Sequence, residues 1–207
     1  MKSKLIGTIC FVLGIIIFVS SGTTFAYFSA TANNTGDDIS GSTMSFDVSL
    51  TPTTIKKATQ LIPLEDNLIT TAITKNSNKC IDKKGYEVCT LYELRLSNSG
   101  DPQILNGFIQ TKTATYTTNN LKCQLFDSNY NPVSDIMTLS RGTDKTYFKK
   151  GSNYVTTDIE YNDVTYYLAI WLHETNQNQS EDYGKTFSGT IAFESINGNQ
   201  IAAEFTS

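Results

Sequence analysis

The chain contains very little of what catalytic and metal sites are built from. Its 207 residues include one histidine, His173, one tryptophan and four prolines. One histidine cannot build a His-rich zinc site or an H-E-x-x-H motif, and it leaves no second partner for a Ser or Cys nucleophile. Few prolines exclude a proline-rich stalk. We therefore expect no catalytic centre and no cofactor, and we interpret His173 as a surface residue at the end of a strand.

Charge is also scarce. Asp, Glu, Lys and Arg together make up 17% of the chain, and the formal net charge is −4. Lys2 and Lys4 belong to a leader that we expect to be removed, which leaves 14 basic and 20 acidic residues. A mildly acidic remainder should bind neither nucleic acid nor anionic lipid by bulk electrostatics. The threonine, serine, asparagine and tyrosine that dominate it are typical of strands and turns.

No apolar run reaches the length of about 20 residues that a membrane-spanning helix needs. The longest, Leu5 to Val19, follows a basic start and precedes small residues, as in a signal peptide. Thr24 and Ala26 then occupy the −3 and −1 positions of a cleavage site. We predict that residues 1–26 are a signal peptide cut between Ala26 and Tyr27. The alternative is an uncleaved N-terminal transmembrane anchor. Either places the rest of the chain outside the membrane.

The remainder divides into two parts. Residues 27–42 form a polar segment that opens on two aromatic residues, Tyr27 and Phe28. This segment is either a leader remnant or an anchor that packs into something. Residues 43–207 carry eight or nine strand-like stretches at spacings typical of a sandwich or jelly roll. We therefore predict an all-β, jelly-roll-like antiparallel β-sandwich with one short helix.

The strand predictions rest on alternation. Met44, Phe46, Val48 and Leu50 face one way, and Pro52 should end that strand. Both alternating rows of 164–173 are largely apolar, which predicts a central strand buried on both sides. The further predicted strands are 88–96, 104–118, 121–126, a hairpin within 147–159, 187–193 and 201–205.

A single stretch has helical spacing. Apolar residues between Leu61 and Lys75 recur at the intervals of an amphipathic helix. Pro63 suits its first turn, and Glu65 and Asp66 lie where the helix dipole favours acids. We expect a short helix that caps one end of a sheet.

Three cysteines follow the leader. Cys80 and Cys89 flank a turn-rich loop, and outside the reducing cytosol we favour a disulfide between them over two free thiols. Cys123 is left over in a predicted strand. It is either a buried, inert thiol or a site of intermolecular pairing.

Other candidate sites have simpler explanations. Asp127, Asn129 and Asn131 start like a calcium loop, but proline and threonine occupy the positions of its glycine and glutamate, so we favour an ordinary turn. A weak surface calcium site formed by three loop acids is less expected than solvated carboxylates; these acids are Glu174, Glu181 and Asp182. Core packing explains a group of aromatic residues better than a carbohydrate platform does; they are Tyr154, Tyr161, Tyr166, Tyr167 and Trp171.

Short motifs at both ends resemble a known family. Residues 21–29 read S-G-T-T-F-A-Y-F-S, similar to the G-T-x-A-x-F junction of proteins cut by the SipW-type signal peptidase. Residues 41–48 resemble the first strand of the TasA-like matrix fibre proteins and camelysin, and residues 168–175 with 189–193 resemble their closing strand pair. The resemblance covers the first 50 residues and about 30 near the end.

The resemblance to the TasA/camelysin-like family implies a jelly-roll-like sandwich and assembly by β-strand addition, with residues 27–42 as the donor segment. We therefore expect a secreted or cell-surface structural protein, a subunit of an extracellular fibre or biofilm matrix. Its partners would be copies of itself and, during export, a signal peptidase, with the membrane touched only through the N-terminal segment. A surface adhesin or carbohydrate-binding module is the alternative, and a camelysin-like peptidase is the least expected.

Overall fold

The computed structural model describes residues 30–33, 46–58, 61–74, 80–142, 144–182 and 184–206. The predicted signal peptide, 1–26, lies outside these residues, together with the cleavage site between Ala26 and Tyr27 and with Phe28. The start of the first predicted strand, at Met44, and the end of the predicted helix, at Lys75, lie outside them too. In the part of the chain that is described, no helix has the length and apolar character needed to cross a membrane.

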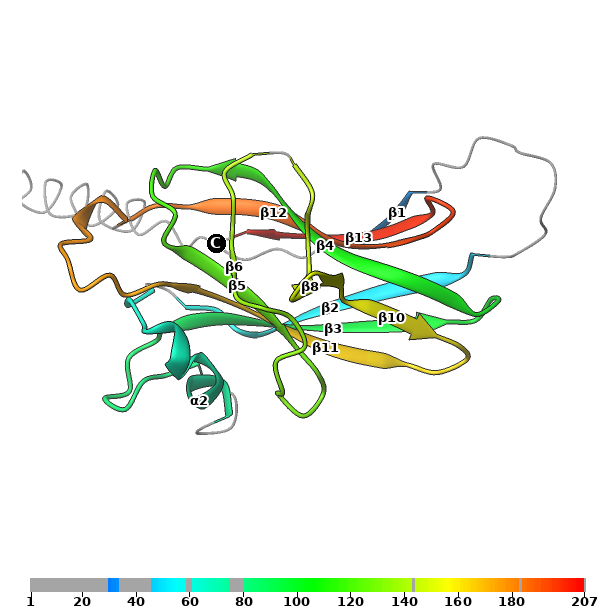
Figure 1. Ribbon diagram of the computed structural model, residues 1–207, viewed down its shortest axis with the longest axis horizontal. Helices are drawn as coiled ribbons and strands as arrows, with labels where there is room; N and C mark the ends of the chain where they lie inside the picture. The colour runs from blue at the N-terminus through cyan, green and yellow to red at the C-terminus, as the bar shows by residue number, and fades with distance from the viewer. Residues whose placement is uncertain are drawn as a thin grey trace, which may run out of the picture.

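Two antiparallel sheets face one another (Figure 1). Sheet A has the order β1 (Ala30–Asn33), β13 (Gln200–Thr206), β12 (Phe187–Ser195), β4 (Gln103–Ala114) and β10 (Thr156–Ile159), and β7 (Thr146–Tyr147) also pairs with β4. Sheet B has the order β2 (Val48–Lys56), β3 (Cys89–Asn98), β11 (Val164–Leu172), β5 (Leu121–Phe126) and β6 (Met137–Thr138). A small hairpin joins β8 (Lys149–Lys150) to β9 (Asn153–Tyr154). The prediction of an all-β sandwich is confirmed.

The main core lies between the two sheets, where alternate side chains of each strand meet. Leu168 and Ile170 of β11 point into it, while Ala169 and Trp171 are fully buried on the opposite face of the same strand. β11 pairs with β3 on one side and with β5 on the other. The predicted central strand, buried on both faces, is therefore confirmed.

The prediction that Pro52 ends its strand is wrong. β2 continues through Pro52 to Lys56, with Pro52 opposite Leu94 of β3. β2 is the edge strand of sheet B, and one side of an edge strand needs no ladder hydrogen bond from its backbone N–H groups. Proline is tolerated there for that reason. The alternation of this strand is as predicted, with Val48 and Leu50 buried.

The predicted helix is much shorter than 61–75. A 3₁₀ turn, η1 (Asp66–Leu68), leads into α2 (Ile69–Thr74). Leu64 is extended, because its N–H donates to the carbonyl of Leu172 at 2.8 Å and its own carbonyl accepts from Glu174 at 3.0 Å. This pairing with the end of β11 takes Pro63 out of the helix.

The helix packs against one face of sheet B. Its buried residues, Ile69, Ala72 and Ile73, form a second core cluster with Leu91 and Trp171. These two residues lie on the face of sheet B that points away from sheet A, and Figure 1 shows α2 on that side. The helix therefore lies on the outer face of sheet B, near the end of the sheet where β3 begins and β11 ends.

Candidate assembly site

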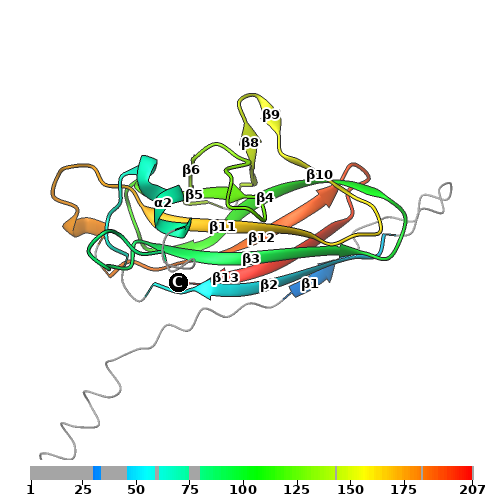
Figure 2. The same ribbon diagram turned by 90° about the horizontal axis from the view of Figure 1, so that it is seen from below.

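The N-terminal edge of sheet A is formed by part of the segment predicted to be a donor strand. β1, from residues 27–42, pairs antiparallel with β13 of the same chain. Ala30 lies opposite Ala203, and Asn33 lies opposite Gln200. β2, the edge of sheet B, lies beside β13 and β1, so the two sheets approach each other along this side (Figure 2).

β13 presents a clear pattern to its neighbours. Ile201, Ala203 and Phe205 are buried in the core between the sheets, and the residues between them point outward. The Phe205 ring lies 6.0 Å from Tyr92 and 6.1 Å from Phe187, measured between ring centroids. A strand that pairs with β13 would therefore turn every second side chain toward the core, and the one opposite Phe205 would lie beside this aromatic group.

β12 supports Phe205 through a glycine. A Cβ at Gly189 would lie 2.5 Å from the backbone oxygen of Gln110 and 2.7 Å from the Phe205 ring. Atoms do not approach that closely, so the position requires glycine. The register between β12 and β4 shifts between Ser188 and Gly189, which brings the two backbones together at this point.

The other described edges are poor templates for strand addition. β2 carries Pro52, β6 has two residues and β10 has four. Short edge strands and edge prolines are common protections against unwanted pairing. Without β1, β13 would be a seven-residue edge with a single charged residue, Glu204. β13 is therefore the edge in the described chain that is best suited to accept a strand.

Comparison with protein-family models, with curated proteins and with solved structures finds no match to this chain.

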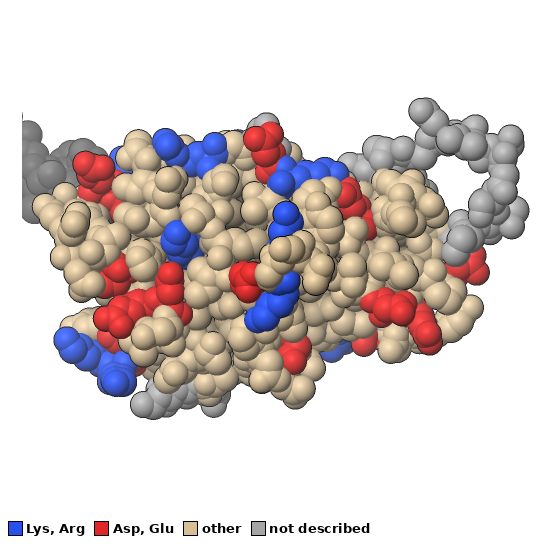
Figure 3. All heavy atoms as spheres, viewed as in Figure 1, with Lys and Arg blue, Asp and Glu red and all other residues tan. Residues whose placement is uncertain are grey.

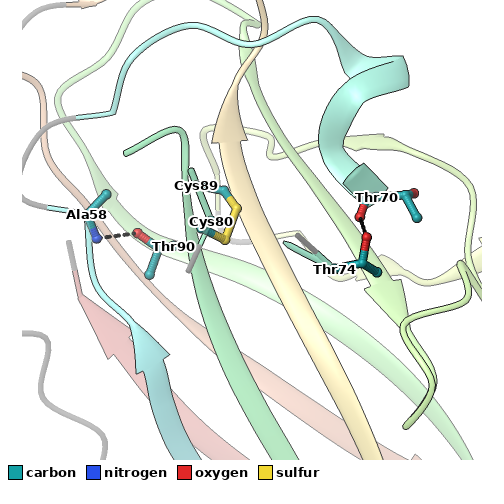
Figure 4. Close-up of a disulfide and its surroundings, with 6 residues drawn as sticks. All are labelled: Ala58, Thr70, Thr74, Cys80, Cys89 and Thr90. Carbon is teal, nitrogen blue, oxygen red and sulfur yellow. Dashed lines mark hydrogen bonds between the residues drawn. A yellow bond between two sulfur atoms is a disulfide. The ribbon is translucent and has the colours of Figure 1, made fainter. Parts of the chain in front are cut away.

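Cys80 and Cys89 form a disulfide, and both residues are fully buried against the outer face of sheet B (Figure 4). The buried side of α2 belongs to the same core cluster as the bridge. Closing a loop of about ten residues stabilises the fold by about 2–3 kcal/mol. Cys123 lies in the core between the sheets, on the opposite face of sheet B from the disulfide, and burial raises the pKa of its thiol to about 12. This burial favours the inert thiol over intermolecular pairing.

His173 belongs to a polar cluster that the sequence did not predict. It follows β11 and is half-buried, and its Nδ1 lies 2.8 Å from Oδ1 of Asp66. The same carboxylate oxygen accepts a hydrogen bond of 2.9 Å from Nε1 of the buried Trp171. Asp66 thereby ties η1 to the end of β11. Its separation from Trp171 by 105 positions explains why no local pattern could reveal the cluster.

The candidate calcium loop at Asp127 is a turn. Oδ1 of Asp127 accepts from the backbone N–H groups of Asn129 at 2.8 Å and Asn131 at 2.9 Å, and Oδ2 accepts from the Asn131 side chain at 3.1 Å. Burial alone would raise the pKa of this carboxyl, but the hydrogen bonds from Asn131 and Asn129 outweigh it, and the pKa is lowered. The carboxylate closes its own turn, as expected of an ordinary Asx turn.

Glu174 and Asp182, two of the loop acids after β11, bind different partners and do not share a site. Oε1 of Glu174 accepts from the backbone of Asn176 at 2.7 Å, whereas Asp182 accepts from Thr118 and Asn120. The described residues hold no group of three or more His, Cys, Asp or Glu side chains placed to bind a metal ion.

The aromatic residues considered for a carbohydrate platform are dispersed. Trp171 is fully buried, and Tyr166 is buried with its hydroxyl bonded to Thr157. Tyr167 stacks on Tyr130, with their ring centroids 4.4 Å apart. The two strongly exposed members lie on different elements: Tyr154 on β9 and Tyr161 in the turn between β10 and β11.

Proposed function

We propose that this chain is an exported structural protein of the cell surface or extracellular matrix, a subunit of a fibre or biofilm matrix that assembles by β-strand addition. The observation that carries the proposal is the pairing of β1 with β13. A segment near the N-terminus already completes the edge of sheet A. In the assembly, the same segment leaves its own chain and completes the sheet of the next copy.

Exchange of β1 between copies conserves the backbone hydrogen bonds, because β1 meets an identical β13 in either chain. Domain swapping of this kind is a low-cost route to association. The contact is heterologous, since each copy gives one strand and receives one, so it extends into an open chain of subunits. Because association is reversible, the polymers should lengthen as the protein concentration rises.

A jelly-roll-like arrangement is part of the proposal. It is supported by the connections that pass between sheets A and B, from β3 to β4, from β4 to β5, from β10 to β11 and from β11 to β12. Two sheets linked in this way are held together by the chain itself, so the N-terminal segment can leave without opening the core.

The register of β1 assigns different roles to the two aromatic residues of the donor segment. Continued toward the N-terminus, a donor strand would place Phe28 opposite Phe205 and Tyr27 opposite Thr206. Directly opposite residues of an antiparallel pair share one face. Phe205 faces the core, so Phe28 would enter it, while Tyr27 would point outward.

Phe28→Ala in the chain comprising residues 27–207 is expected to raise the concentration needed for polymers by tenfold or more, because a buried aromatic anchor is lost. Tyr27→Ala, the matched control, is expected to polymerise within about twofold of the parent, as rim residues contribute little. Light scattering and negative-stain microscopy measure both. Equal effects of the two substitutions, or no effect of either, would contradict strand addition in this register.

A further inference from the structure

The two ends of the sandwich differ in charge. The disulfide loop, Cys80–Cys89, leads into one end of β3, and the turn after Asn98 lies at the other end. Ten residues of strand separate them by about 33 Å. The loop and the turn therefore lie at opposite ends of the long axis of the domain, as Figure 1 shows for the two ends of β3.

The disulfide loop presents a rigid basic tip. Oδ1 of Asp82 accepts hydrogen bonds of 2.8 Å from the backbone N–H groups of both Lys84 and Tyr86. Lys83 and Lys84 are exposed, and the Tyr86 side chain is 55% exposed. The remaining acid of the loop, Glu87, forms an ion pair with Lys56. The exposed charged side chains at the tip are therefore the two lysines, and they lie close to an exposed aromatic residue in the chain.

The opposite end is acidic. Its turns are held together by hydrogen bonds from Ser99 to Asp47 and from the Asn98 side chain to the carbonyl of Ile159. The described residues of this end, 46–47, 98–104, 158–163 and 195–200, contain no lysine or arginine. They contain five acids: Asp47, Asp101, Asp158, Glu160 and Asp163. In Figure 3 the end farthest from α2 displays acidic spheres without basic ones.

Three apolar side chains are exposed among these acids. Ile104 is 58% exposed, Tyr161 75% and Ile196 91%. Ser195 and Leu105 are Cα partners, so Ile196 and Ile104 each lie one residue beyond that pair, at the same end of neighbouring strands. Single exposed apolar residues are ordinary, but a group rimmed by like charges is typical of an interaction surface.

We propose that the acidic end of one copy binds the Lys83–Tyr86 tip of the next copy, in a head-to-tail contact. The inference rests on the proposed function, since it adds a second contact to the strand-linked polymer. The occupant is a second copy because the far end of this same chain supplies the complementary charge together with an exposed ring. Such a heterologous contact does not close on itself and propagates along the long axis.

Charge reversal tests this contact. The double substitution Lys83→Glu with Lys84→Glu is expected to weaken self-association of the exported chain about tenfold at low salt, and Glu160→Lys with Asp163→Lys to do the same. The difference should shrink in about 0.5 M salt, where the Debye length falls well below 10 Å. Lys149→Glu with Lys150→Glu changes the same charge on the β8–β9 hairpin and is the matched control, expected to stay within about twofold of the parent.

Mixing makes the test specific. The two reversed variants carry opposite charge patterns, so an equimolar mixture restores both contacts and should associate like the parent in sedimentation velocity. Unchanged melting temperatures show that each variant folds. A mixture that stays as weak as its components, or a control as weak as the loop variant, overturns the proposal.

The outcomes also separate this contact from strand addition. Polymers that are lost with Phe28→Ala but not with either reversal retain strand addition and overturn the head-to-tail contact. Association that weakens with the reversals but not with Phe28→Ala retains the contact and overturns strand addition. No association in the parent chain at any concentration overturns both.

Discussion

Deletion of residues 27–42 should abolish polymer formation. A chain of residues 27–207 is expected to form filaments or ladders of oligomers, whereas residues 43–207 should remain without polymers at concentrations at least tenfold higher. The reason is that the deletion removes β1, the strand that pairs with β13. Size-exclusion chromatography with light scattering, together with negative-stain microscopy, compares the two chains.

The shortened chain provides its own control. Its β13 edge has no donor, so a synthetic peptide of residues 27–42 should bind it and raise its melting temperature, while a scrambled peptide of equal composition should not. A shortened chain that still polymerises, or whose melting temperature does not rise with the peptide, would show that the N-terminal segment is not the donor. If both chains, 27–207 and 43–207, stay monomeric, strand addition is contradicted and the adhesin alternative is favoured.

Gly189→Ala should destabilise the domain by about 3 kcal/mol or more, because a single methyl group would overlap the backbone of β4 and the ring of Phe205. Loss of this size is a large share of a typical domain's stability, which lies between about 5 and 15 kcal/mol. Since Phe205 belongs to β13, the same change should also disturb the acceptor edge. Chemical denaturation of the chain of residues 27–207 measures the effect.

Substitutions at two other glycines serve as controls, because their expected losses of stability are smaller. Gly142→Ala meets no atom within 4 Å, so its effect should stay within about 0.5 kcal/mol. A Cβ at Gly107 would lie 3.0 Å from the rings of Phe148 and Phe193, which can shift, and an intermediate loss is expected. If Gly189→Ala were as mild as Gly142→Ala, the packing of β12 against Phe205 described above would be wrong.

Strands with strong local patterns could be predicted from the sequence. The predicted strand 121–126 has the same bounds as β5, and the doubly apolar stretch 164–173 extends one residue beyond β11. Alternation reveals such strands because one or both of their faces are buried, and burial depends on residue type at a period of two. The Asp127 turn was predictable for a similar reason, since its hydrogen bonds join residues at most four positions apart.

Features set by distant partners could not be predicted. Pro52 lies inside β2 only because β2 is an edge strand, which depends on the order of the sheet. The helix begins later than predicted because Leu64 pairs with residues more than 100 positions away. The sequence of β1, A-T-A-N, carries no strand pattern of its own, and its place follows from the open edge of β13.

The most direct test of strand addition asks whether β1 and β13 meet between chains. Thr31 and Ala202 are paired Cα partners, and neighbouring residues across an antiparallel ladder lie within reach of a disulfide. One chain carrying Thr31→Cys is mixed with another carrying Ala202→Cys under polymer-forming conditions and oxidised. The account predicts disulfide-linked heterodimers on a non-reducing gel. Mixed chains that stay unlinked, while a chain bearing both substitutions closes within itself at every concentration, would contradict it.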